Sequence, residues 1–144
     1  MQPVLGVDFG RVRIGLAISD ELRLLAHPLE TVAAGAKAIA RIQEIVAERN
    51  IESVVIGIPK LLSGATGAAA NEAALFAEKL RQALPCKVVS WDERLTTVAA
   101  ERALREAGKK TRATRGYIDQ VAAQMILQGF LDRQQADELP TTTA

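Results

Sequence analysis

The sequence predicts an α/β fold in which a mixed five-stranded sheet is flanked by helices. Three short strand-like runs joined by turns occupy residues 4–32 and indicate an antiparallel meander. Beyond them, helical periodicity alternates with two short apolar runs, which requires parallel strands joined by right-handed crossovers. The chain has 144 residues, 49% of them apolar, which is enough for one core. We therefore expect a single domain over residues 1–138 and a frayed tail over 139–144.

The three strands of the meander are expected at residues 4–9, 14–19 and 24–32. The first is a continuous apolar run that ends at Gly10, as expected of a buried strand. Pro28 interrupts the third run, and proline cannot donate a hydrogen bond to a neighbouring strand. The third strand should therefore lie at an edge of the sheet or contain a bulge.

The middle of the chain alternates between helix and strand. Ile39, Ile42 and Val46 recur at helical spacing, and Asn50 is a suitable helix end. A buried parallel strand is expected at residues 53–58, where the apolar run is continuous. Gly, Ala, Ser and Thr dominate residues 61–70, which favours a flexible loop, and a helix over 73–84 and a strand over 87–91 follow.

Two helices are expected in the last third of the chain. Thr96 or Thr97 can cap a helix that ends at Gly108. Residues 109–115 are polar and basic and are predicted to form a loop. The final helix is expected from about Tyr117 to Arg133.

Composition excludes several classes of site. The formal net charge is +1, so any affinity for nucleic acid must come from a local patch. One cysteine and one histidine exclude a zinc site built from Cys and His, and any metal must be held by carboxylates. No apolar run approaches the length needed to cross a bilayer, so a cytoplasmic protein without membrane contact is expected.

Four acidic residues are candidates for catalysis. Asp8 lies within an apolar strand, where a charge is costly unless it is paired or bound to metal. Asp119 is the only acid on the apolar face of the last helix, and Asp92 and Glu93 follow a strand end. Each has a structural alternative: a turn contact for Asp8, a favourable charge at a helix start for Asp119, and a solvated cluster for the pair. Converging acids of this kind could hold two metal ions for phosphodiester hydrolysis.

Basic residues accompany these acids in the chain and are expected to contact nucleic-acid phosphates without reading sequence. The alternative is a set of solvated loop charges. The candidates are Arg11, Arg13, Lys60, Arg94, Lys109, Lys110, Arg112 and Arg115.

Three segments together resemble a known bacterial family. Residues 5–10 and 13–20 resemble the opening of the family of Holliday-junction-resolvase-like proteins and pre-16S ribosomal RNA nucleases. Residues 92–97, followed by Ala100 and Glu101, resemble its second signature. Ile118 and Asp119, with alanines at 122 and 123, resemble its third. The order and spacing match over nearly the whole chain.

This resemblance implies a ribonuclease-H-like fold and a cytoplasmic nuclease that trims the 5′ end of pre-16S rRNA, in contact with the assembling small ribosomal subunit. It implies Mg²⁺ or Mn²⁺ as the cofactor, because carboxylates suit hard cations. The implied catalytic residues are Asp8, Asp92, Glu93 and Asp119. Asp8, Glu93 and Asp119 are the expected metal ligands, with Asp92 left as an alternative to Glu93.

Two departures from the family pattern leave other functions open. Residues 59–67 lack the acid and asparagine that the family usually has in this loop, and the fourth strand ends without an acid. The alternatives are a non-catalytic RNA-binding module for ribosome assembly, a phosphotransferase, and a Holliday junction resolvase acting on branched DNA. A resolvase would need two coordinated sites and hence a homodimer, whereas an RNA nuclease could act as a monomer.

Overall fold

The computed structural model describes residues 2–59, 67–92 and 112–138, with the side chains of 112–117, 137 and 138 excepted. Five strands form one sheet in the order β3-β2-β1-β4-β5. The strands are β1 (Val4–Asp8), β2 (Arg13–Ser19), β3 (Ala26–Ala33), β4 (Ser53–Ile58) and β5 (Lys87–Asp92). The first three are antiparallel neighbours, and β4 and β5 run parallel to β1. The predicted meander with two added parallel strands is thus confirmed.

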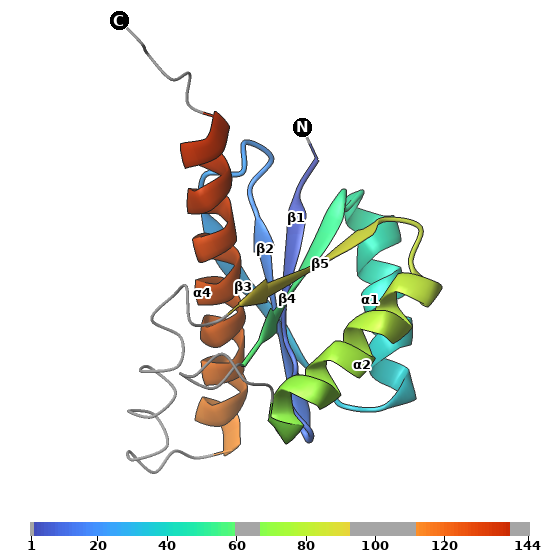
Figure 1. Ribbon diagram of the computed structural model, residues 1–144. Helices are drawn as coiled ribbons and strands as arrows, with labels where there is room; N and C mark the ends of the chain where they lie inside the picture. The colour runs from blue at the N-terminus through green and yellow to red at the C-terminus, as the bar shows by residue number, and fades with distance from the viewer. Residues whose placement is uncertain (1, 60–66, 93–111, 139–144) are drawn as a thin grey trace, which may run out of the picture.

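Helices cover both faces of this sheet (Figure 1). The helices are α1 (Ala36–Arg49), α2 (Ala68–Ala83) and α4 (Arg112–Glu138). Helices α1 and α2 pack on one face in a core that includes Leu5 and Val7 of β1. Helix α4 packs on the other face in a core that includes Val4. Since successive strand residues point to opposite faces, Asp8 shares the α4 face with Val4 and Gly6.

Two glycines allow α4 to lie directly against the sheet. A Cβ atom added to Gly6 would lie 2.8 Å from Cβ of Leu127. A Cβ atom on Gly15 would overlap the backbone carbonyl of Asp119. Because Gly15 is the β2 partner of Asp8, the start of α4 is held next to the carboxyl end of β1.

The edge strand β3 is tied to α4 by glutamine side chains. Gln128 Oε1 accepts a hydrogen bond from the Ala26 backbone N–H at 2.8 Å, and Gln124 Nε2 donates to the Ala26 carbonyl at 2.9 Å. The β2–β3 register shifts between Leu16 and Ala17, opposite Pro28. The expectation of an edge strand or bulge at Pro28 is confirmed on both counts.

Two predicted boundaries are wrong. Helix α4 begins at Arg112, so residues 112–115 are helical rather than part of a basic loop. Helix α2 begins at Ala68, within the predicted loop of residues 61–70. Alanine and arginine are strong helix formers, and this propensity outweighs the polar character of the two segments. The predicted helix that ends at Gly108 lies outside the described residues.

The end of α1 agrees with the sequence. Asn50 adopts a left-handed conformation, with φ of 55°, and its N–H bonds to the Val46 carbonyl. None of the helices in the described part of the chain is both long enough and apolar enough to cross a membrane.

Candidate active site

Asp8 is the last residue of the central strand β1 and is only 7% exposed. Val4 and Gly6 precede it on the α4 face of the sheet. A buried carboxylate is costly unless hydrogen bonds or opposite charge compensate it. The fold therefore places a desolvated acid at the carboxyl end of a strand, where sites of α/β proteins commonly form.

Asp119 reaches the same place from α4. Its backbone rests on Gly15, the residue paired with Asp8 across the β1–β2 ladder. The residues of α4 that follow at helical spacing, Ala123 and Leu127, lie against Gly6. Helix α4 thus runs along β1 in the direction that brings its Asp119 to the Asp8 end of the strand. Two acids predicted as site residues are brought together.

Asp119 forms an ion pair with Arg13. Arg13 Nε donates to Asp119 Oδ2 at 2.8 Å, and the two side chains are 34% and 23% exposed. Arg13 is the first residue of β2 and shares a face with Gly15 and Ala17, which is the face that α4 covers. The sequence predicts Arg13 as a phosphate contact, whereas the structure pairs it with an acid of the candidate site.

A second ion pair links the turn after β1 to α2. Arg11 Nε donates to Glu72 Oε2 at 2.6 Å. This hydrogen bond, and then the charge of Glu72, raise the pKa of the Arg11 guanidinium. The pair fixes the direction of an arginine that is otherwise largely exposed.

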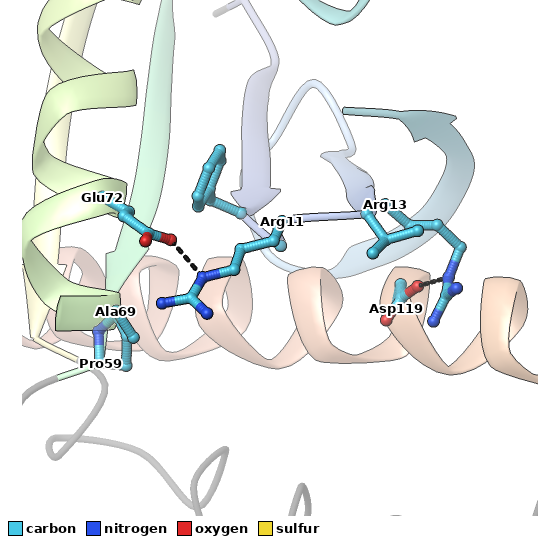
Figure 2. Close-up of a pocket in the computed structure, with 9 residues that line it drawn as sticks. Arg11, Arg13, Pro59, Ala69, Glu72 and Asp119 are labelled. Atoms are coloured by element: carbon cyan, nitrogen blue, oxygen red, sulfur yellow. Dashed lines mark hydrogen bonds and ion pairs between the residues drawn. The ribbon is translucent and has the colours of Figure 1, made fainter. Parts of the chain in front are cut away.

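The two ion pairs line one pocket of about 400 Å³. Figure 2 shows the Arg11 pair against α2 and the Arg13 pair against α4, with Pro59 and Ala69 beside the former. Gly10 makes the turn possible, because a Cβ there would overlap the Arg13 carbonyl. The full lining is Phe9, Gly10, Arg11, Val12, Arg13, Pro59, Ala69, Glu72 and Asp119. The pocket therefore combines two arginines with the acid that each of them pairs with, Glu72 and Asp119.

Asp92 lies elsewhere in the sheet. It ends β5, and β4 separates that strand from β1. Val89 and Trp91 pack toward α4, whereas Ser90 bonds Arg81 of α2, so alternation puts Asp92 on the α2 face. The structure does not bring Asp92 onto the face that carries Asp8 and Asp119.

Several predicted residues are not placed. Glu93, Arg94, Lys60, Lys109 and Lys110 lie outside the described residues. Arg112 and Arg115 lie on the first turns of α4, where only the backbone is described. Within the described ranges, no three His, Cys, Asp or Glu side chains gather as a metal-binding group.

The described donors fit a hard cation in their chemistry. Asp8 and Asp119 offer carboxylate oxygens from a central strand and a packed helix, and such ligands suit Mg²⁺ or Mn²⁺. Two such acids provide only part of a coordination shell, so a further ligand must come from another part of the chain, from solvent or from substrate.

Sequence reasoning missed Glu72. Its position in an amphipathic helix resembles that of any solvated glutamate, and it lies 61 positions from Arg11 in the chain. Only the packing of α2 beside the β1–β2 turn reveals it as a partner of Arg11.

Comparison with known proteins identifies a family whose sequences match this chain. Residues 2–133 match the RuvX family model, described as Holliday junction resolvase. A relative from Nocardia farcinica is 48% identical over 92% of this chain and 78% of its own length. A relative from Halalkalibacterium halodurans is 44% identical over 91% of this chain and 96% of its own. Both bear the name "Putative pre-16S rRNA nuclease".

A solved structure supports the fold. Thermus thermophilus RuvC, in complex with a Holliday junction substrate, is similar over 94% of this chain and 96% of that chain. The TM-score is 0.59 and the sequence identity is 16%, so this likeness speaks for the fold alone. The ribonuclease-H-like fold implied by the sequence resemblance is confirmed.

Proposed function

Because the chain belongs to the RuvX family, we propose that it is a metal-dependent nuclease that hydrolyses phosphodiesters of pre-16S rRNA at the 5′ end. The observation that carries the proposal is the meeting of Asp8 and Asp119 beside a pocket lined by Arg11 and Arg13. Acids that bind divalent metal support phosphodiester hydrolysis, and arginines next to them suit the binding of the substrate phosphate. Processing of ribosomal RNA precursors would place this activity in the cytoplasm.

Asp8, Asp119 and Glu93 are the proposed metal ligands. When bound, Mg²⁺ or Mn²⁺ polarises the phosphodiester and activates water for attack. Asp8 and Asp119 would hold the cation at the carboxyl end of β1. Their partial burial strengthens the attraction between each carboxylate and the cation, because fewer waters screen it.

Glu93 is preferred over Asp92 as the third ligand. Asp92 lies on the face of β5 that α2 covers, away from Asp8 and Asp119. Glu93 is the next residue along the chain. Substituting each in turn tests the choice: Glu93→Gln should weaken Mn²⁺ binding measured by calorimetry, and Asp92→Asn should weaken it far less. The reverse order would make Asp92 the ligand.

Arg11 and Arg13 are the proposed contacts to substrate phosphates in the pocket. Arginine binds phosphate through several N–H groups in a fixed plane. Lys60, Arg94, Lys109, Lys110, Arg112 and Arg115 would extend this basic surface along the nucleic acid. Such contacts hold the backbone without reading base identity.

Cleavage of a single-stranded RNA that spans the 5′ junction of pre-16S rRNA tests the function. Wild type with Mn²⁺ should cut, and Asp8→Asn and Asp119→Asn should each reduce the rate by a factor of roughly a hundred or more. Asp132→Asn is the matched control, because Asp132 is an exposed acid on the same helix. Equal cutting by all four proteins would exclude the proposed site.

A non-catalytic RNA-binding module for ribosome assembly is the second candidate function. It is favoured by the finding that no three His, Cys, Asp or Glu side chains of the described residues form a group that could hold a metal ion. Such a module would bind this RNA equally well with Mg²⁺ and with chelator, and Asp8→Asn would bind like wild type. A four-way DNA junction offered in place of RNA tests resolvase activity, and sedimentation of that complex separates a monomer from a homodimer.

A further inference from the structure

We propose that Arg13 is a built-in competitor of the metal for Asp119 and transfers to a substrate phosphate when the metal binds. This inference rests on the proposed function, because it concerns the same acids. It assigns Arg13 two successive partners, where the sequence predicts only the phosphate.

The geometry of the ion pair supports the first partner. Arg13 Nε and Asp119 Oδ2 are 2.8 Å apart, and both side chains are partly buried. Both residues are fixed in position by the same contact, because Gly15, two residues beyond Arg13, supports the Asp119 backbone. The Arg13 guanidinium thus holds an oxygen of Asp119, the carboxylate that we propose as a metal ligand.

Electrostatics explains why an arginine is suited to this place. Two carboxylates that share a small volume repel each other unless positive charge lies nearby. Arg13 supplies one positive charge to Asp119, whose backbone lies against Gly15, the strand partner of the buried Asp8. A divalent cation would supply that compensation instead and would repel the guanidinium. Metal binding must therefore weaken the Arg13–Asp119 pair.

The pocket offers space for the second partner of Arg13, a substrate phosphate. Arg13 and Arg11 both line it, and Asp119 forms part of its wall (Figure 2). An arginine displaced from Asp119 therefore remains next to the space where a phosphate would lie. Because linkage is reciprocal, a phosphate that attracts Arg13 also frees Asp119 for the metal.

Arg11 is a natural control within the same pocket. It carries the same charge, but its partner is Glu72 on α2, which is not a proposed metal ligand. Arg11→Gln removes one positive charge from the pocket and leaves the partner of Asp119 in place. Arg13→Gln removes one positive charge and that partner together.

Calorimetric titration with Mn²⁺ in the absence of RNA tests the inference. Arg13→Gln should bind Mn²⁺ about fivefold more tightly than wild type, since a pair worth ~1 kcal/mol no longer competes. Arg11→Gln should change the affinity by less than about twofold, because exposed charges are screened by salt. Arg13→Lys keeps the charge with a single ammonium group and should fall between wild type and Arg13→Gln. It also gives the comparison a second variant if Arg13→Gln fails to fold.

The outcomes separate this inference from the proposed function. Unchanged or weaker Mn²⁺ binding by the folded Arg13 variants, together with loss of binding in Asp8→Asn, would overturn the competition and leave the metal site standing. Equal tightening by Arg11→Gln would also overturn it, because general charge would then be the cause. Wild-type Mn²⁺ binding that Asp8→Asn and Asp119→Asn do not reduce would overturn both.

Discussion

At the scale of single residues, Gly15 decides where Asp119 lies. Glycine is required there by space, because the Asp119 carbonyl occupies the position of a Cβ atom. The carboxylate that should bind metal is thus placed through its own backbone, by a residue on another element. A substitution at Gly15 should consequently affect both stability and the candidate site.

Gly15→Ala should lower the free energy of unfolding by about 1–3 kcal/mol, the range for an overpacked contact, and should also weaken Mn²⁺ binding. Urea denaturation measures the first effect and calorimetry the second. Gly67→Ala is the control, since nothing lies within 4 Å of its added Cβ, and it should change stability by less than ~1 kcal/mol. A Gly15→Ala protein as stable as wild type would show that α4 does not rest on β2 as described.

At the scale of elements, α4 serves both the site and the edge of the sheet. Its glutamines bond backbone groups of β3 and of the β2–β3 turn, while Asp119 lies against β2 and Ala123 and Leu127 lie against β1. These bonds use backbone groups near one end of the edge strand, and open edges promote pairing with other chains. The glutamines of α4 thus hold β3 in its place at the edge of the sheet.

Gln128→Ala should lower the free energy of unfolding by about 1–3 kcal/mol, because it removes the hydrogen-bond partner of the Ala26 N–H. Ala26 is only 3% exposed, so water cannot readily replace that partner. Gln43→Ala is the matched control, because that glutamine makes one exposed bond to the Ala83 carbonyl. It should cost less than ~0.5 kcal/mol on the general expectation for surface substitutions. Equal losses in urea denaturation would mean that the β3 contact has no special weight.

At the scale of the whole molecule, the balanced net charge makes local charges decisive. A formal charge of +1 gives no general attraction to RNA, so affinity should depend on the proposed basic contacts. Removing one phosphate contact should reduce the slope of log affinity against log salt by about one. The slope therefore counts the phosphate contacts by a binding measurement that does not depend on catalysis.

Arg11→Gln should therefore weaken RNA binding at low salt and flatten its salt dependence by about one, as measured by fluorescence anisotropy in chelator. Arg49→Gln, in the last turn of α1, is the control with the same loss of charge. If Arg49→Gln changed the slope equally, RNA attraction would come from total charge and not from the pocket.

Metal binding should also register in global stability. Mn²⁺ at a hundred times its dissociation constant should stabilise the folded chain by about 2.7 kcal/mol, which raises the melting temperature by several degrees. Asp8→Asn should show little of this rise in the same scanning experiment. A rise of equal size in that variant would mean that the cation binds elsewhere.

Much of this architecture could be predicted from the sequence. Apolar runs located the strands, and Pro28 correctly marked an irregular edge strand. The starts of α2 and α4 were missed, because charge and small residues suggested loops where alanine and arginine extend helices. Of the predicted site residues, Asp119 lies with its backbone against Gly15, the strand partner of Asp8, and the catalytic role of both acids stays a prediction. Their contact through Gly15 and the pairing of Arg11 with Glu72 depend on tertiary packing, which leaves no local pattern.

The contact between α4 and β1 also sets an order of events during synthesis. Asp8 is synthesised before Asp119, which follows only after all five strands have been made. Chains fold from their N-terminal parts as they emerge, and contacts between distant segments form slowly. All five strands are therefore synthesised before the helix that carries the second acid. Until α4 docks, the growing chain lacks the proposed pair of metal ligands, and we expect no cleavage of RNA before that point.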